Sequence, residues 1–305
     1  MSSNVEHIPC PTCNWTPDQQ RRCSYKSNIN LFYGAGDRGA WSLGSKFILK
    51  DRGSIPPIYE SINIKFVKDN TTIPTPAVAM EWSENDRNIM IVGRVPGKTL
   101  VWRVIAANKE EVWPSMTQVQ KEELAKRTVE HLSQLRQLHG PKMQTVHGEP
   151  LQRGGLFAEN STTLPGCISS EDELFDAISR NFKDTPDEVV ALVKRRMPSP
   201  FPWTFTHGDL TVCNIMVDPE TCELTGIIDW EVSGYYPVWW DYVGQIGLST
   251  DDAEWKKLLR KNMQDFSGAL EWYRDVYACR DQMGLREERW EKMVVDAGLS
   301  IEPPN

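Results

Sequence analysis

The sequence lacks any run of 18 apolar residues, and it has no apolar segment of the secretory type near its N-terminus. We therefore expect neither a membrane-spanning helix nor secretion, and we predict a cytoplasmic location. Positive charge is also scarce, because 34 Lys and Arg residues stand against 42 Asp and Glu residues, a net charge of −8. This acidic balance argues against nucleic acid or an anionic membrane as the main partner.

Cysteine is sparse and odd in number, with seven residues that are mostly scattered singly. Those in apolar surroundings are expected to be reduced core residues. One cluster stands apart, because His7, Cys10, Cys13 and Cys23 could together bind a zinc ion. Its spacing lacks a second pair of close ligands, so the alternative is an irregular arm over residues 1–27 whose thiols pack on the body of the protein.

The chain has no internal repeat and no low-complexity segment. Its 305 residues exceed the size at which one core stops growing, and 40% hydrophobic with 25% charged residues is typical of globular proteins. After the arm, strand-like segments give way to helical ones. We predict an α+β fold with a small β-rich lobe over residues 28–97 and a larger helical lobe over 98–305.

The small lobe is predicted to contain antiparallel strands. Apolar, β-branched and alternating segments predict strands over residues 29–36, 41–52 and 88–95. Between them, Ile58, Ile62 and Phe66 have helical spacing and predict a helix over 58–70. An extended segment with two prolines then leads into a further strand.

The larger lobe is predicted to be mainly helical with an embedded hairpin. A long helix over 116–140 ends at a glycine stop, Gly140. Its apolar stripe consists of Val119, Leu124, Val129, Leu132, Leu135 and Leu138. Two further helices follow over 171–182 and 186–197, then strand-like segments up to residue 231, and the chain after Pro237 is helical and rich in tryptophan.

Gly34, Gly36 and Gly39 have G-x-G-x-x-G spacing in the segment GAGDRG. A dinucleotide-binding fold would need a helix directly after this segment, but the residues that follow are strand-like. The overlapping segment GAWSLGSK has Ser-Lys where a P-loop needs Lys followed by Ser or Thr. Two interpretations remain: a loop whose backbone covers nucleotide phosphates, or a tight hairpin that uses glycine for positive φ.

Lys50 ends the apolar strand segment FILK, and Glu60 lies in the next predicted helix. In phosphotransfer enzymes a strand lysine of this kind holds the α- and β-phosphates, and a helix glutamate fixes the lysine. The alternative is that Lys50 is a solvated strand end beside Asp51 and Arg52.

The most informative segment is HGDLTVCNIMVD over residues 207–218, followed by Asp229 in GIIDWE. Phosphoryl transfer needs a carboxylate that orients the attacking hydroxyl or accepts its proton, and oxygen ligands for Mg²⁺. Asp209 supplies the carboxylate, and Asn214 and Asp229 supply the ligands. The apolar strands between them predict a hairpin that brings these oxygens to one end. His207 is predicted to support the loop by hydrogen bonding rather than to act as the base.

These segments together resemble the aminoglycoside phosphotransferase and choline-kinase-like family, and most closely its fungal branch. The resemblance spans about residues 33–243 and rests on GDRGAWSLGSKFILK, NTTIPTPAV, VPGKTL, THGDL with the following Asn, and GIIDWEVSGYYPVWWDY. It implies a protein-kinase-like bilobal fold. It also implies that Asp209 is the catalytic base and that Asn214 and Asp229 bind Mg²⁺.

The same resemblance implies that Lys50 binds the phosphates of ATP with Glu60 as its partner. It implies further that Gly93 and Val95 offer backbone groups to adenine. The sequence departs from the family pattern at VGRVPG, where an acid and an aromatic residue are frequent. It departs again at Cys213, where a basic or small residue is common. Neither change removes a group that is assigned to nucleotide or metal binding.

The acceptor is expected to lie against the helical lobe near Asp209. Trp230, Glu231 and Tyr235 could form an aromatic and acidic wall that holds a quaternary or protonated amine by cation–π contact. The alternative is that the aromatic rings of this segment pack in the core or between the lobes, and this alternative is favoured for the neighbouring Trp239 and Trp240.

We predict an ATP- and Mg²⁺-dependent phosphotransferase that acts on a hydroxyl of a small molecule, which could also carry an amine. Alternatives are a non-catalytic nucleotide-binding regulator and a repurposed biosynthetic enzyme on the same scaffold. A protein kinase is disfavoured, because no APE segment follows Asp229 and IDWE replaces DFG. The sequence leaves the acceptor and the oligomeric state open.

Overall fold

The computed structural model describes residues 29–35, 38–53, 59–101, 112–151, 156–157, 166–182, 184–244, 250–280 and 286–300. The arm over residues 1–27, with His7, Cys10, Cys13 and Cys23, lies outside the described residues, and so does Gly36.

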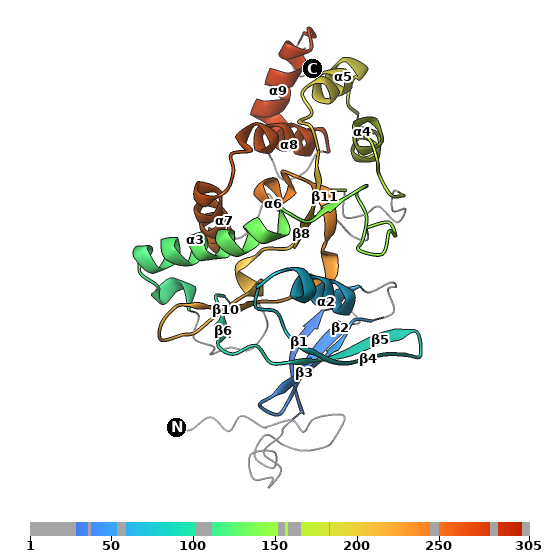
Figure 1. Cartoon of the computed structure of the whole chain (residues 1–305). Helices are drawn as coiled ribbons and strands as arrows, with labels where there is room; N and C mark the ends of the chain where they lie inside the picture. The colour runs from blue at the N-terminus through green and yellow to red at the C-terminus, as the bar shows by residue number, and fades with distance from the viewer. Residues whose placement is uncertain are drawn as a thin grey trace, which may run out of the picture. The chain divides into compact units, whose positions relative to one another are not determined.

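The chain divides into two compact units (Figure 1). The first unit comprises residues 1–56, 77–94 and 104–108, and the second comprises 57–76, 95–103 and 109–305. The predicted lobes, 28–97 and 98–305, place residues 57–76 in the small lobe, whereas the structure groups them with the second unit.

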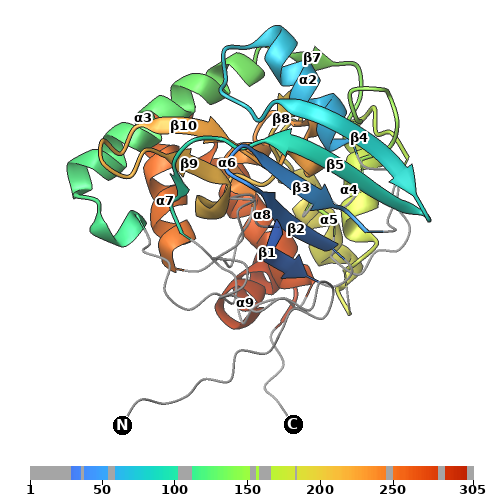
Figure 2. The same cartoon turned by 90° about the horizontal axis from the view of Figure 1, so that it is seen from below.

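The described part of the first unit forms a five-stranded antiparallel sheet in the order β1-β2-β3-β5-β4 (Figure 2). The strands are β1 (Ile29–Ala35), β2 (Arg38–Leu43), β3 (Phe47–Asp51), β4 (Val78–Glu84) and β5 (Arg87–Gly93). The single strand predicted over 41–52 is wrong, because the chain reverses between β2 and β3. Gly44 has φ of 63° in this turn, a left-handed conformation that glycine adopts at little cost.

The helices that the structure describes belong to the second unit. They are α2 (Glu60–Asn70), α3 (Gln118–Leu135), α4 (Glu171–Ser179), α5 (Asp187–Arg195), α6 (Trp240–Val243), α7 (Thr250–Asn262), α8 (Ser267–Cys279) and α9 (Arg286–Asp296), with short 3₁₀ turns η1 (Trp113–Ser115), η2 (Val212–Asn214) and η3 (Trp230–Val232). Helices α3 and α7 pack side by side (Figure 1). None of the helices described in the structure combines the length and the apolar character that crossing a bilayer would need.

Two small sheets also belong to the second unit. Their strands are β6 (Lys98–Thr99), β7 (His139–Gly140), β8 (Trp203–Thr206), β9 (Ile215–Val217), β10 (Leu224–Ile227) and β11 (Gly234–Pro237), in the orders β10-β9-β6 and β11-β8-β7. The predicted hairpin corresponds to β9 and β10, which pair antiparallel with Ile227 opposite Ile215.

Helix α3 begins at a capping box. The side chain of Thr117 accepts a hydrogen bond from the amide of Gln120, and the side chain of Gln120 accepts one from the amide of Thr117. The helix ends at Leu135, earlier than the predicted stop at Gly140, which lies in β7.

The buried face of α3 shares Leu124, Leu132 and Leu135 with the predicted stripe and differs from it elsewhere. It consists of Leu124, Ala125, Thr128, Leu132 and Leu135. Val119, predicted to be part of this stripe, is 75% exposed, so that assignment is wrong. At 100° per residue, Val119 lies about 180° around the helix from Thr128, on the side that faces solvent.

Helix α2 starts at Glu60 and also buries another face than the one predicted. Of the predicted apolar stripe, Ile58 lies outside the described residues, and Ile62 and Phe66 are only half-buried. The buried residues are Glu60, Ser61, Asn63, Ile64 and Val67. Because several of these are polar, hydrophobic periodicity could not identify this face.

The core of the second unit contains the tryptophan-rich segment. Trp239 and Trp240 are almost fully buried, which confirms the prediction that they pack in the core. The ring of Trp239 lies 5.6 Å from that of Trp272, and the ring of Trp240 lies 5.5 Å from that of Tyr273, with edge-to-face geometry.

The two faces of α3 predict different mutational costs. Leu132→Ala should lower the free energy of unfolding by about 2–5 kcal/mol, because it leaves a cavity against the core. Val119→Ala on the exposed face should change the free energy of unfolding by less than about 0.5 kcal/mol. Urea unfolding followed by circular dichroism measures both, and equal costs would show that the assignment of the buried face is incorrect.

Candidate functional site

The loop over residues 207–214, here called the HGD loop, begins at a fully buried histidine. Nδ1 of His207 accepts a hydrogen bond of 3.2 Å from the amide of Asp209. Since an amide can only donate, the ring proton lies on Nε2, which donates to the carbonyl oxygen of Ile228 at 3.0 Å. The ring also contacts Trp230 edge-on at 4.5 Å. His207 therefore ties the loop to the residue before Asp229.

Gly208 is required by the backbone of the HGD loop. Its φ is 84°, and a Cβ atom at this position would lie 2.8 Å from the carbonyl oxygen of Val232. Its amide donates to the carboxylate of Asp241, which is 8% exposed. Burial raises the pKa of Asp241, and the positive charges of Arg136 and Lys256 and the Gly208 hydrogen bond oppose this rise.

Asp209 and Asn214 are in direct contact. The Nδ2 atom of Asn214 donates to the backbone oxygen of Asp209 at 2.8 Å and to its Oδ2 atom at 2.9 Å. The planar amide therefore turns its Oδ1 atom away from the Asp209 carboxylate. The short turn η2 creates this contact, and the amide of Val212 in that turn donates to Oδ1 of Asp252 in α7 at 3.0 Å.

Asp229 follows β10 at the same end of the β9–β10 hairpin. The amide of Ile228 donates to the carbonyl oxygen of Asn214 at 3.0 Å, so the backbone of Asp229 lies next to that of Asn214. Asp229 has φ of 68° and ψ of 59°, a left-handed conformation that non-glycine residues seldom adopt. Such conformations persist where the surrounding structure imposes them, and they concentrate at functional sites.

The turn after Asp229 is held by a helix that the sequence did not connect with it. Nδ2 of Asn63 in α2 donates to the carbonyl oxygens of Trp230 at 2.8 Å and Ser233 at 3.1 Å. Ser233 in turn donates from its hydroxyl to the carbonyl oxygen of His207 at 2.8 Å. The only sequence signal for this role is a polar residue between apolar ones in SINIK.

The aromatic side chains predicted to contact an acceptor have core positions instead. Trp230 is fully buried, and its indole N–H donates to the carbonyl oxygen of Ile227 at 2.8 Å. Tyr235 is largely buried, and its ring lies 5.6 Å from that of Phe205. This packing corrects the predicted wall, because little of either ring remains for an acceptor. Glu231 is half-buried.

In the first unit, the described residues that were predicted to contact the nucleotide lie on the sheet. Lys50 in β3 pairs with Ala40 on one side and Met90 on the other. Gly34 and Gly39 stand opposite each other across β1 and β2. Glu60 belongs to the second unit, so its pairing with Lys50 stays a prediction.

The two residues predicted to contact adenine, Gly93 and Val95, fall in different units. Gly93 ends β5, and its amide already donates to the carbonyl oxygen of Ala77 at 2.7 Å. Val95 is buried in the second unit beside Gly226, where an added Cβ would lie 2.6 Å from its Cγ1 atom. Contact with adenine stays a prediction for both residues.

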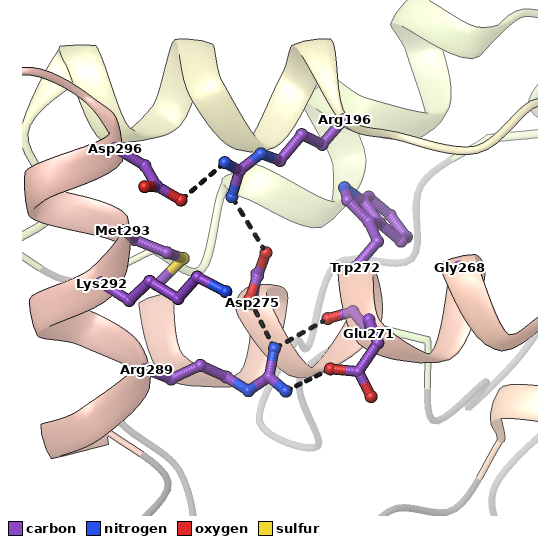
Figure 3. A pocket seen from close by; sticks show the side chains of 9 residues that line it. All are labelled: Arg196, Gly268, Glu271, Trp272, Asp275, Arg289, Lys292, Met293 and Asp296. Carbon is purple, nitrogen blue, oxygen red and sulfur yellow. Dashed lines mark hydrogen bonds and ion pairs between the residues drawn. The ribbon is translucent and has the colours of Figure 1, made fainter.

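A pocket of about 380 Å³ lies among α5, α8 and α9 of the second unit (Figure 3). Its lining contains none of the predicted site residues. The guanidinium of Arg289 contacts both Glu271 and Asp275, the latter at 2.8 Å. Arg196 contacts Asp296 at 2.7 Å.

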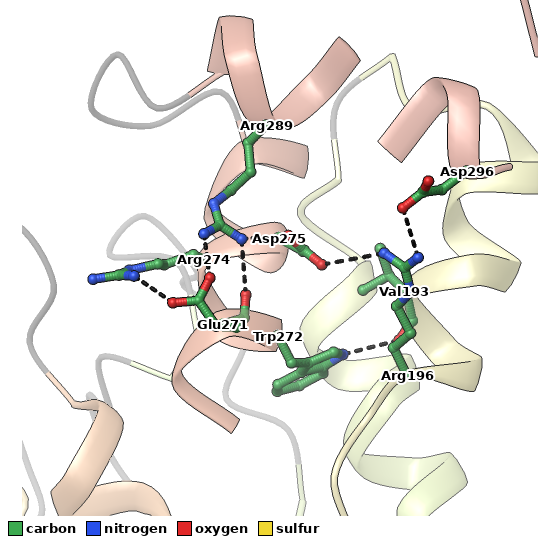
Figure 4. A network of polar contacts seen from close by, with 8 residues as sticks. All are labelled: Val193, Arg196, Glu271, Trp272, Arg274, Asp275, Arg289 and Asp296. Carbon is green, nitrogen blue, oxygen red and sulfur yellow. Dashed lines mark hydrogen bonds and ion pairs between the residues drawn. The ribbon is translucent and has the colours of Figure 1, made fainter. Parts of the chain in front are cut away.

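The charges of this pocket compensate one another (Figure 4). Arg196 reaches Asp275 as well, at 3.8 Å, so Asp275 lies between two guanidinium groups. Burial raises the pKa of Asp275, although Arg289 and Arg196 oppose this effect. The indole N–H of Trp272 donates to the carbonyl oxygen of Val193 at 2.9 Å. We infer that this network joins the three helices.

Comparison with known proteins identifies the family. The sequence profile described as "Phosphotransferase enzyme family" matches residues 85–276, which include the HGD loop and the β9–β10 hairpin. The chain belongs to this phosphotransferase family. No curated protein matches the sequence of this phosphotransferase.

Solved structures share the fold of this phosphotransferase at low sequence identity. The streptomycin–ATP–APH(2″)-IIa ternary complex is 13% identical, with a TM-score of 0.52 over 92% of this chain and 94% of that chain. The GDP complex of an aminoglycoside 2′-phosphotransferase-IIIa mutant is 14% identical, with a TM-score of 0.53 over 92% of this chain and 91% of that chain. The predicted α+β, protein-kinase-like bilobal fold is thereby confirmed.

The geometry of the HGD loop predicts that a methyl group added at Gly208 lowers the free energy of unfolding, whereas one added at an open glycine position does not. Gly208→Ala should lower the free energy of unfolding by about 1–3 kcal/mol, because it forces a strained φ and a clash with Val232. Gly268→Ala in α8 is the matched control, since open space surrounds that position and alanine favours helix by about 0.5–1 kcal/mol. Chemical denaturation of both variants measures the difference, and a neutral Gly208→Ala would contradict the described loop.

Proposed function

We propose that this phosphotransferase transfers the γ-phosphate of ATP, in the presence of Mg²⁺, to a hydroxyl group of a small molecule that could also carry an amine. The observation that carries the proposal is the hydrogen-bonded pair of Asp209 and Asn214, with Asp229 following at the same end of the hairpin. Support for a small-molecule acceptor comes from the streptomycin complex of a protein with the same fold. The intact polar set favours a competent enzyme over a non-catalytic regulator.

Asp209 is the proposed catalytic base. Its carboxylate would orient the acceptor hydroxyl and accept its proton as the hydroxyl oxygen bonds to the γ-phosphorus and the bond to the ADP oxygen breaks. His207 holds the backbone before Asp209, and Asn214 holds its carboxylate from the other side. Both contacts restrict the base to one orientation, which lowers the entropy cost of reaching the transition state.

The donor set fits a magnesium ion. The Oδ1 atom of Asn214 and the carboxylate of Asp229 are hard oxygen ligands of the kind that Mg²⁺ prefers. Bound Mg²⁺ would supply charge neutralisation for the β- and γ-phosphate oxygens. Among the described residues, no group of three or more His, Cys, Asp and Glu side chains could hold a metal ion. The proposed ligands are therefore one carboxylate and one amide, with phosphate oxygens of ATP as further ligands.

The nucleotide contacts form the second part of the proposal. The residues proposed to contact ATP are Gly34, Gly36, Gly39, Lys50, Glu60, Gly93 and Val95. Support for the glycines comes from the pairing of Gly34 with Gly39, which leaves only a short connection between β1 and β2. Since the amide of Gly93 already donates within the sheet, its carbonyl oxygen is the backbone group proposed to face adenine.

Removal of the proposed base should separate transfer from binding. Asp209→Ala should lower kcat by about 10²- to 10⁴-fold, because no carboxylate remains to accept the proton, while MgATP still binds. ADP release with a panel of aminoglycosides, choline, sugars and amino alcohols measures transfer, and calorimetry measures binding. Glu220→Ala in the exposed turn of the same hairpin is the control. Normal turnover of Asp209→Ala would disprove its role as the base.

Loss of the second metal ligand should appear in nucleotide binding. Asp229→Asn keeps the side-chain shape and tolerates the left-handed backbone, but it removes the negative charge that holds the cation. We expect wild-type protein to melt at a higher temperature with MgATP than with ATP and EDTA, and we expect this difference to vanish in Asp229→Asn. Thermal shift measures it, and a variant that keeps the full magnesium dependence would rule out Asp229 as a ligand.

A further inference from the structure

Helix α7 carries a stripe of three polar residues toward the HGD loop and α6. Asp252, Lys256 and Arg260 are spaced by four residues and so lie on one side of the helix. At one end, Asp252 accepts the hydrogen bond from the amide of Val212 in the loop. At the other end, Nε of Arg260 donates to the carbonyl oxygen of Tyr242 in α6 at 2.8 Å. The stripe therefore holds both segments at its two ends.

Lys256, the middle member, is 4% exposed. Burial, with a smaller effect of the nearby Arg260, lowers the pKa of Lys256 to about 8, although the carboxylates of Asp241 and Asp209 oppose this change. A buried ammonium group without nearby acids would lose its proton. The two acids thus keep Lys256 mainly charged at neutral pH, and the same attraction acts back on them.

The two acids beside Lys256 control the same short segment. Asp241 accepts the amide hydrogen bond of Gly208, and Asp209 is the next residue along the chain. A buried carboxylate is a good acceptor only while it stays ionised, and Lys256 together with Arg136 favours the ionised form of Asp241. Removal of the ammonium would have two effects. It would weaken the interaction between Asp241 and the amide of Gly208, here called the Gly208 anchor, and it would remove a positive charge that acts on Asp209.

We propose that Lys256 is a positioning residue: from its buried place on α7, between the Asp252 contact to the HGD loop and the Arg260 contact to α6, its ammonium group acts on Asp241 and Asp209 and fixes the HGD loop in the orientation that phosphoryl transfer requires. The catalytic consequence rests on the function proposed above, whereas the effect on the loop does not. In the sequence, Lys256 stands in the segment WKKLLRK and resembles an ordinary solvent-facing lysine.

The neighbouring lysine offers a matched control. Lys257 is adjacent in α7 but exposed, so Lys256→Met and Lys257→Met make the same chemical change in opposite environments. Methionine keeps the unbranched apolar stem and removes only the charge. Lys256→Arg retains a positive charge and tests whether charge alone restores the loop.

Hydrogen exchange of the HGD loop tests the positioning directly. In Lys256→Met, amides of residues 207–214 should exchange on the order of tenfold faster than in wild type, because the anchor at Gly208 weakens. In the same variant, kcat should fall on the order of tenfold or more, while the Kd for MgATP stays within about twofold. Lys257→Met should match wild type in all three, and Lys256→Arg should recover part of the loss. Lys256→Met with wild-type exchange and wild-type kcat would overturn the inference.

The pH profile provides a readout that a purely structural role would not move. The charged groups around Lys256 are Asp241 from α6, Asp209 from the HGD loop, and Asp252 and Arg260 from α7 itself. Because Lys256 loses its proton as pH rises through about 8, kcat of wild type should fall there. Lys256→Arg should keep its activity to higher pH, since arginine stays protonated. An alkaline limb at the same pH in both proteins would contradict the proposal.

Failure of this inference can be told apart from failure of the proposed function. If wild type transfers no phosphate to any acceptor but Lys256→Met still shows faster exchange at 207–214, the function is refuted and the positioning role stands. If wild type is an active kinase and Lys256→Met equals Lys257→Met in exchange and kcat, the function stands and the positioning role is refuted.

Discussion

The candidate site depends on one buried imidazole that bonds in two directions. His207 accepts from the amide of Asp209 in the HGD loop and donates to the carbonyl oxygen of Ile228 at the end of β10. Because these two segments are separate in sequence, no local turn preference could bring them together. The imidazole is fully buried, so an unmade hydrogen bond at either nitrogen would carry its full desolvation cost. This cost makes the loop and the hairpin end a single structural element, and Asn63 of α2 extends it to the turn after Asp229.

Around this element, the second unit contains two kinds of charged network. Arg196, Arg289 and their acidic partners join α5, α8 and α9 with charges that remain partly exposed, so each pair contributes modestly. The group formed by Asp241 and Lys256 is more deeply buried. Buried ion pairs seldom add net stability compared with apolar residues, because both charges lose their hydration. A role in holding the HGD loop gives a physical reason for charges at this position, where apolar side chains would pack more easily.

Membership of the phosphotransferase family establishes the class of reaction. It does not identify the acceptor, which has to be inferred from the residues of this chain. The aromatic residues of WEVSGYYPVWW mostly pack in the core, so their abundance near Asp229 reflects stability rather than recognition. Glu231 is the half-buried acidic residue among them, and it keeps a polar group near the proposed metal ligand.

The sequence by itself determined the features that depend on short spacing. The offset of five positions from Asp209 to Asn214 and the apolar strands of the β9–β10 hairpin identified the site, because these contacts form within a few residues of each other. Only the tertiary structure decided the orientation of α2 and α3 and the turn at Gly44. It alone assigned roles to Asn63, Asp241 and Lys256, which are polar residues on helices that resemble surface positions in sequence. Their function comes from partners far along the chain, and no local pattern encodes a contact made after the helices pack.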